Sequence, residues 1–132
     1  MNGKTDDPLA VLISGDAKAV DRKQLADLLK PFIQIDLNSK EFSFLPAFAR
    51  LESNDEKIEI LLAATKARAL YFDVADGLLP KEIIDLAIMP VGSTKSSLKR
   101  LFDDHKIKKD KEGRYVIPTY RVSELTEKLA VD

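Results

Sequence analysis

The stretch Leu79–Tyr120, LPKEIIDLAIMPVGSTKSSLKRLFDDHKIKKDKEGRYVIPTY, decides the fold of this chain. Pro80 suits a first helical turn, where a missing N–H loses no partner, and Pro90 is expected to end that helix. Val91 and Gly92 are the predicted turn, and leucines at helical spacing predict a second helix after it. The expected inner faces are Ile83, Ile84, Leu86 and Ala87 in the first helix, and Leu98, Leu101 and Phe102 in the second.

The second helix, residues 94–104, is expected to expose a polar face that fits a nucleic-acid groove. Ser93 is its predicted N-cap. Lys95 in the first turn opposes the helix dipole, at a cost of about 0.3–1 kcal/mol, and a phosphate bound at this end would use both the dipole and the ammonium group. The predicted outer face consists of Thr94, Lys95, Ser97 and Arg100, with Lys99 at its edge.

A basic β-hairpin is predicted over residues 106–118. Ile107 begins its first strand, and Asp110–Gly113 is a turn in which glycine suits a positive φ. Tyr115 and Ile117 alternate with Arg114 and Val116 in the return strand. The cations of this hairpin are Lys108, Lys109, Lys111 and Arg114.

The distribution of charge separates this region from the rest of the chain. The 132 residues carry a net charge of -1. Residues 91–122 contain nine basic and four acidic side chains, a net of +5, whereas residues 1–90 contain 11 basic and 15 acidic ones, a net of -4. A local basic face is the electrostatic footprint of a nucleic-acid binder, although charge asymmetry alone identifies no partner.

A helix over residues 56–74 is predicted before the deciding stretch. Ser53 is its N-cap, Glu56 occupies the capping-box position, and Gly77 is the expected residue just beyond its end. One face of this helix is apolar or small, and it consists of Ile58, Leu61, Leu62, Thr65, Ala69 and Phe72.

The N-terminal residues predict a short helix and a small hairpin. Asp21 is the expected cap of a helix that Pro31 ends, and alternating apolar residues predict strands at Ile33–Leu37 and Phe42–Leu45. The apolar run Leu9–Ile13 fits either a helical turn or a strand, and residues 1–7 are expected to be loose.

The pattern DGLLPKEI…STKSSLKRLFDDHKIKKDKEGRYVI resembles the winged helix-turn-helix superfamily of prokaryotic DNA-binding proteins, over about Ile58–Tyr120. The resemblance implies an α+β fold, mainly α, with an N-terminal helix and β-hairpin extension at 1–55. The winged helix-turn-helix would occupy 56–122 and a short C-terminal helix 123–132. The sequence departs from the family at His105 and Lys106, where a glycine and an apolar residue are usual, but histidine tolerates a positive φ.

The resemblance also implies a function, which is regulation of transcription through double-stranded DNA. Recognition helix 94–104 would enter the major groove, and the basic wing 106–118 would contact the backbone or the minor groove. The DNA-binding residues would be Ser93, Thr94, Lys95, Ser97, Lys99 and Arg100 in the helix, and Lys108, Lys109, Lys111 and Arg114 in the wing.

Two other functions remain open from the sequence. Winged helices also act as protein–protein interaction adaptors without binding DNA. A homodimer through helix 56–74 or the C-terminal helix would follow if an apolar face stayed exposed. The other open function is a small-ligand sensor in which residues 1–55 form a pocket, and no motif supports it.

Catalytic, metal and membrane motifs are weak or missing. The chain has no cysteine and one histidine, so we expect no metal site, no cofactor and no enzyme activity. Gly92–Ser96 lacks the Gly-Lys pair of a phosphate-binding loop, and the Ser96-x-x-Lys99 spacing stands without its partner motifs. No apolar run approaches a membrane span, and the N-terminus makes a poor signal peptide, so a cytoplasmic protein is expected.

Overall fold

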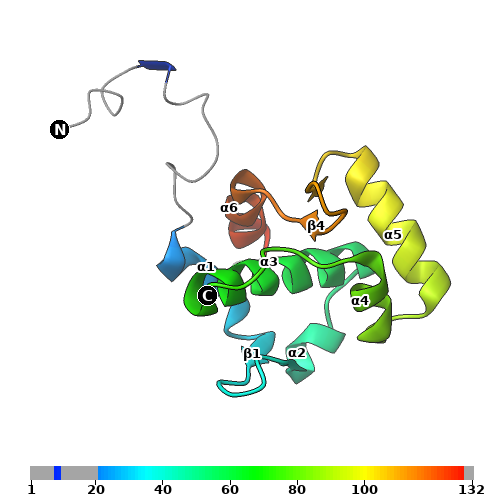
Figure 1. Cartoon of the computed structure of the whole chain (residues 1–132), viewed down its shortest axis with the longest axis horizontal. Coiled ribbons are helices and arrows are strands. Elements are labelled where there is room, and N and C mark those ends of the chain that lie inside the picture. Colours follow the sequence, from blue (N-terminus) through cyan, green and yellow to red (C-terminus); the bar gives the residue numbers. More distant parts are fainter. Residues whose placement is uncertain (1–7, 10–20, 130–132) are drawn as a thin grey trace.

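The fold is built around helix α3 (Asn54–Phe72), which crosses the middle of the molecule in Figure 1. The computed structural model describes residues 8–9 and 21–129, so the predictions for residues 1–7, for most of Leu9–Ile13 and for 130–132 lie outside it. The fold is α+β and mainly helical. The other elements are α1 (Arg22–Leu29), β1 (Ile33–Ile35), β2 (Phe42–Phe44), α2 (Pro46–Ala49), α4 (Pro80–Asp85), α5 (Val91–Asp103), β3 (Lys108–Lys109), β4 (Tyr115–Val116) and α6 (Thr119–Lys128).

Helix α3 is buried on all sides from Ile58 to Lys66, where even Glu59 and Lys66 lie away from solvent, and Glu56 in its first turn is also buried. Ser53 caps it as predicted, since its hydroxyl accepts a hydrogen bond from the Glu56 N–H at 3.1 Å. A helix that other elements surround needs apolar residues on more than one face. This accounts for the run of leucines, isoleucines and alanines in its middle, and it makes α3 the core of the fold.

The predicted end of α3, at residue 74 with Gly77 just beyond it, lies too far along the chain. The helix ends at Phe72, because Asp73 adopts a left-handed conformation with φ 58° and its N–H bonds to the Ala69 carbonyl at 2.9 Å. The chain then bends at Asp76 and Gly77 and reaches Leu78, which pairs with Tyr115 through two backbone hydrogen bonds of 3.1 and 2.8 Å. This pairing attaches the C-terminal hairpin to the segment between α3 and α4.

The predicted turn at Val91-Gly92 is also wrong. Helix α4 ends at Asp85, and Ala87 turns the chain with φ 53°. Pro90 is the N-cap of α5, so Val91 and Gly92 lie in its first turn and Ser93 is not the cap. The positive φ at Ala87 turns the chain out of the helical path, so α4 ends before the restriction that Pro90 places on Met89 could act.

Both predicted hairpins are present. In the first, Ile33 pairs with Phe44 and Ile35 with Phe42. In the second, Lys108 pairs with Val116 and Lys109 with Tyr115. The carboxylate of Asp110 accepts hydrogen bonds from the N–H groups of Glu112 and Arg114, both at 2.9 Å, and Gly113 adopts φ 86°, which fixes the second turn.

Helices α1 and α6 pack against each other at one end of the molecule, and α4 and α5 lie at the other end (Figure 1). One hydrophobic core extends from Leu25 in α1 through Leu61 in α3 to Leu125 in α6. Helix α6 begins at Thr119, earlier than the predicted residue 123. Among the helices of residues 21–129, none combines the length and hydropathy that a membrane-spanning segment needs.

Candidate nucleic-acid interface

Two of the predicted contact residues on α5 face the core. Thr94 and Ser97 are each only 1% exposed, so their assignment to the outer face is wrong. The Thr94 hydroxyl donates to the Pro90 carbonyl at 3.2 Å, and the Ser97 hydroxyl accepts from the Arg100 guanidinium at 3.2 Å. Because both hydroxyls have partners, burial carries no unsatisfied polar atom, and these small side chains fit where α5 packs against α3.

Phe102 was also assigned to the wrong face of α5. It was expected on the inner face, but its side chain is 41% exposed. The buried positions of α5 are Thr94, Ser97, Leu98 and Leu101, which turns the exposed ridge toward Lys95, Ser96, Lys99, Phe102 and Asp103. Ser96 and Phe102 were missed as surface residues. The helical phase set by Leu98 and Leu101 places Ser96 on the opposite side of the helix, whereas Phe102 follows Leu98 by four residues and gives no such signal.

Arg100 is exposed, but its guanidinium is already paired with a carboxylate. Its guanidinium forms two hydrogen bonds with the Asp55 carboxylate, at 2.9 and 2.6 Å, and so joins α5 to the first turn of α3. The Arg100 hydrogen bonds hold the pKa of Asp55 below its usual value of 3.8, and they outweigh the opposing effect of burial. Arg100 therefore connects α5 to α3, and its guanidinium could bind a phosphate only by breaking the ion pair with Asp55.

This ion pair gives a pH-dependent prediction. Asp55→Asn should lower the free energy of unfolding by about 1 kcal/mol at neutral pH, because one charge-assisted interaction is lost from a partly exposed site. Since the pKa of Asp55 is lower in the folded than in the unfolded chain, its stabilisation is complete above about pH 4 and is lost as pH falls through the folded pKa.

The gap between wild type and Asp55→Asn should therefore close in acid, which urea unfolding at a series of pH values would measure. Asp85→Asn is the matched control, because it removes only an exposed pair with Lys81, 3.1 Å apart, and should change stability by less than about 0.5 kcal/mol. A gap for Asp55→Asn that persists below both pKa values would contradict the assignment.

The remaining cations of α5 differ in their availability. Lys99 forms an exposed ion pair with Asp103 at 2.7 Å, which a phosphate would have to displace. Lys95 is exposed and has no ion-pair partner within residues 21–129. Ser93 is half-buried beside it. The N-terminal half of the ridge is therefore the part best able to accept a phosphate.

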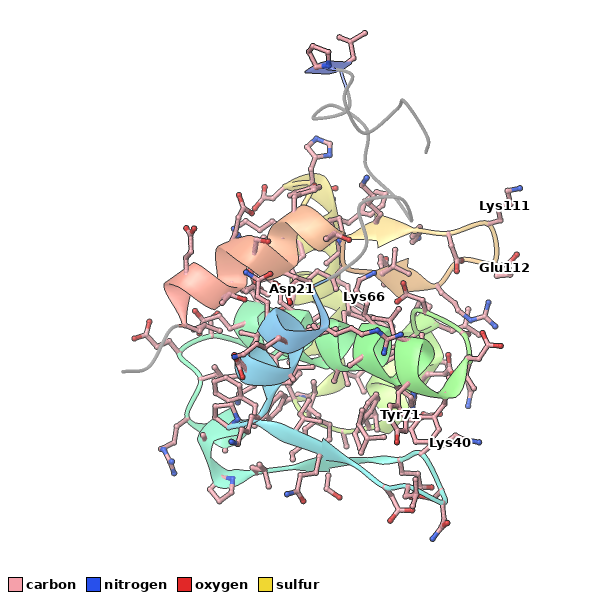
Figure 2. The ribbon with its side chains drawn as sticks, turned by 90° about the vertical axis from the view of Figure 1, so that its left-hand side faces the viewer. Asp21, Lys40, Lys66, Tyr71, Lys111 and Glu112 are labelled. Atoms are coloured by element: carbon pink, nitrogen blue, oxygen red, sulfur yellow. The ribbon has the colours of Figure 1, made fainter. Side chains whose placement is uncertain are left out.

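The hairpin β3–β4 presents a second group of cations. Lys108, Lys109 and Lys111 are exposed, whereas Arg114 is half-buried and lies 3.5 Å from the Glu112 carboxylate. Figure 2 shows Lys111 and Glu112 at the tip of the hairpin, projecting beyond the helices. The corner between α5 and the hairpin is closed by His105, which adopts φ 61° as its tolerance for positive φ predicts.

A different surface lies at the C-terminal end of α3. A groove of about 480 Å³ runs between α1, β1 and the last turns of α3, and its lining is mainly apolar. Leu37 and Tyr71 border it and are 68% and 73% exposed. Tyr71 lies well apart from Lys111 in Figure 2, so this groove is separate from the basic hairpin.

Within residues 8–9 and 21–129, no group of three acidic, histidine or cysteine side chains is placed to hold a metal ion. Comparisons of the chain with protein-family models, with curated proteins and with solved structures find no match.

Proposed function

We propose that this chain binds double-stranded DNA as a winged helix-turn-helix and regulates transcription. The observation that carries the proposal is the exposed ridge of α5 running into the lysines of β3–β4, on a chain whose order is α3, the Leu78 bridge, α4, α5 and a paired hairpin. Helix α5 would lie in the major groove, and the hairpin would lie on the backbone or the minor groove.

The structure narrows the residues that we assign to this role. From α5 they are Lys95, Ser96 and Lys99, with Ser93 at the edge. From the hairpin they are Lys108, Lys109 and Lys111, with Arg114 partly held by Glu112. Thr94 and Ser97 are buried and Arg100 is bound to Asp55, so none of these three is assigned a DNA contact.

Binding to random-sequence duplex DNA, followed by fluorescence anisotropy across a salt series, tests the proposal. Phosphate contacts release counterions, so the logarithm of the affinity should fall linearly with the logarithm of the salt concentration. Absence of binding at low salt would overturn the proposal and favour the protein-adaptor function.

Two lysine variants test the α5 part and the hairpin part of the expected interface separately. Lys95→Ala should weaken binding by about 1–3 kcal/mol if the side chain reaches a base edge, and the loss should depend on sequence. Lys109→Ala should weaken binding to all sequences alike and reduce the salt slope by about one.

Lys23→Ala is the control for these variants, because it also removes an exposed lysine, but from α1, where it pairs with Asp27. If Lys95→Ala and Lys109→Ala both bind like this control, the proposed face is wrong.

The second candidate function is protein–protein interaction through the apolar groove. Exposed Leu37 and Tyr71 beside it are the observation that favours this function, since large exposed apolar side chains mark interaction surfaces. A homodimer through this end of α3 would place two α5 helices on one palindromic site. Sedimentation velocity over a range of concentrations tests it, and a monomer at every concentration would reject the dimer.

A further inference from the structure

The corner where α5 meets the hairpin carries a cluster of aromatic rings and lysines. The rings of Phe102 and Tyr115 meet edge to face, with centroids 6.3 Å apart and planes at 75°. The Lys109 ammonium lies 5.6 Å from the Phe102 centroid and 5.0 Å from that of Tyr115. Beside them, Lys108 lies 5.8 Å from the ring of Tyr120. Cationic groups therefore accompany each ring at this corner.

The cluster borders a hollow of about 520 Å³. Its walls are Phe102, Asp103, His105, Ile107, Lys108 and Lys109. Ile107 is 1% exposed and gives it an apolar base, whereas Phe102 is 41% exposed at its edge. The single carboxylate in these walls, Asp103, is already paired with Lys99 at 2.7 Å, so the hollow combines an apolar surface with uncompensated positive charge.

The rings are held in place by contacts within the fold. Tyr115 is buried beneath Phe102 and pairs with both Lys109 and Leu78 through the backbone. The Tyr120 hydroxyl donates to the His105 carbonyl at 2.6 Å. An exposed ring that packs on a buried tyrosine and is flanked by lysines has the chemistry that single-stranded nucleic acids recognise, with a base on the ring and phosphates on the ammonium groups.

We propose that Phe102 stacks an unpaired nucleobase, and that Lys108 and Lys109, which contact the duplex backbone in the proposed function, hold the phosphates where the same strand leaves the duplex. The ligand is then a DNA duplex with an adjoining single-stranded segment. A base inside a duplex is covered by its neighbours on both faces, so away from the duplex ends only an unpaired base offers a free face to the ring. This inference rests on the proposed function, because it places the single strand beside the duplex that Lys95 and Lys99 contact.

The experiment compares three labelled DNAs by fluorescence anisotropy with the full chain. They are a blunt duplex, the same duplex with a short thymidine overhang, and the same overhang without its bases, each overhang made in both strand polarities. The thymidine overhang of one polarity should bind about 5- to 150-fold more tightly than the abasic one, because base–aromatic stacking has this magnitude while the phosphate charge is unchanged.

Phe102→Leu and Phe102→Tyr are the matched variants. Leucine keeps an apolar side chain without a ring, so the variant should bind the thymidine overhang and the abasic overhang with equal affinity. Tyrosine keeps the ring and should retain the preference. Because Phe102 is partly exposed, both variants are expected to fold, and circular dichroism would check this.

The outcomes separate this inference from the proposed function. The inference is overturned if the protein binds the thymidine overhang no more tightly than the blunt duplex, or if Phe102→Leu keeps the preference for the thymidine overhang. The proposed function stands in both cases. Equal binding of abasic and thymidine overhangs overturns it as well, because charge alone would then explain the affinity. Binding to none of the DNAs overturns both.

Discussion

Replacing Arg121 with alanine is expected to lower the free energy of unfolding by about 3–5 kcal/mol, because it leaves a charge buried without its partner. Glu59 in α3 is 1% exposed, and its carboxylate accepts two hydrogen bonds from the guanidinium of Arg121, which is itself 9% exposed. This ion pair raises the pKa of Arg121. Typical domain stabilities are about 5–15 kcal/mol, so the loss would be a large part of the total.

Urea unfolding monitored by circular dichroism measures this loss, and a double variant tests its cause. Glu59→Leu combined with Arg121→Met removes both charges and fills the space with apolar atoms, which often restores or exceeds the original stability. The double variant should therefore be markedly more stable than Arg121→Ala. A single variant that costs less than about 1 kcal/mol would contradict this account, because it would show that water reaches the Glu59 carboxylate and replaces the guanidinium.

Local patterns predicted the elements whose signals lie close together in the sequence. Ser53 before the start of α3, the alternation of Ile33 and Ile35, and the Asp110–Gly113 turn each act within a few residues. Helix caps, strand alternation and turn chemistry are short-range effects. These elements were therefore accessible without any knowledge of what packs against them.

The ends of α3 and α4 were misplaced because the strongest local breakers were not the ones that acted. Gly77 and Pro90 were chosen by residue type, whereas Asp73 and Ala87 turn the chain with positive φ. The reason for the early end of α3 is tertiary, since the chain must reach Tyr115 at Leu78. Pairing of this kind joins residues far apart and leaves no local signal.

The polar face of α5 could be predicted only in part for a related reason. Polarity placed Thr94 and Ser97 outside, but each hydroxyl finds a hydrogen-bond partner within the helix and can be buried. Arg100 was counted as available because Asp55, 45 residues away, is invisible to a local pattern. Lys95 and the hairpin lysines were correctly expected at the surface, because long cations are rarely buried without a partner.

Replacing Gly77 with alanine is expected to cost about 2–4 kcal/mol of unfolding free energy and to displace the basic hairpin. Gly77 adopts φ 131°, where a side chain is strained by about 1–3 kcal/mol. An added Cβ would also lie 2.6 Å from Cγ1 of Val116 and 2.8 Å from the Tyr115 carbonyl oxygen. That oxygen accepts the Leu78 N–H, so relief of the clash requires the hairpin to separate from the segment that holds Gly77 and Leu78.

Variants of the other two described glycines separate the strain of a positive φ from the clash with the hairpin, because a Cβ on either glycine would meet no atom within 4 Å. Gly113→Ala should show the strain of a positive φ alone, about 1 kcal/mol or more. Gly92→Ala, in the first turn of α5, should be neutral or stabilising by up to about 1 kcal/mol. Urea unfolding should therefore show the largest loss of unfolding free energy for Gly77→Ala, a smaller one for Gly113→Ala and the smallest for Gly92→Ala.

Since the hairpin carries Lys108, Lys109 and Lys111, Gly77→Ala should also weaken duplex binding where the protein remains folded. Equal losses for Gly77→Ala and Gly113→Ala would mean that the contact between Gly77 and the hairpin gives way without cost, and DNA affinity should then be unchanged.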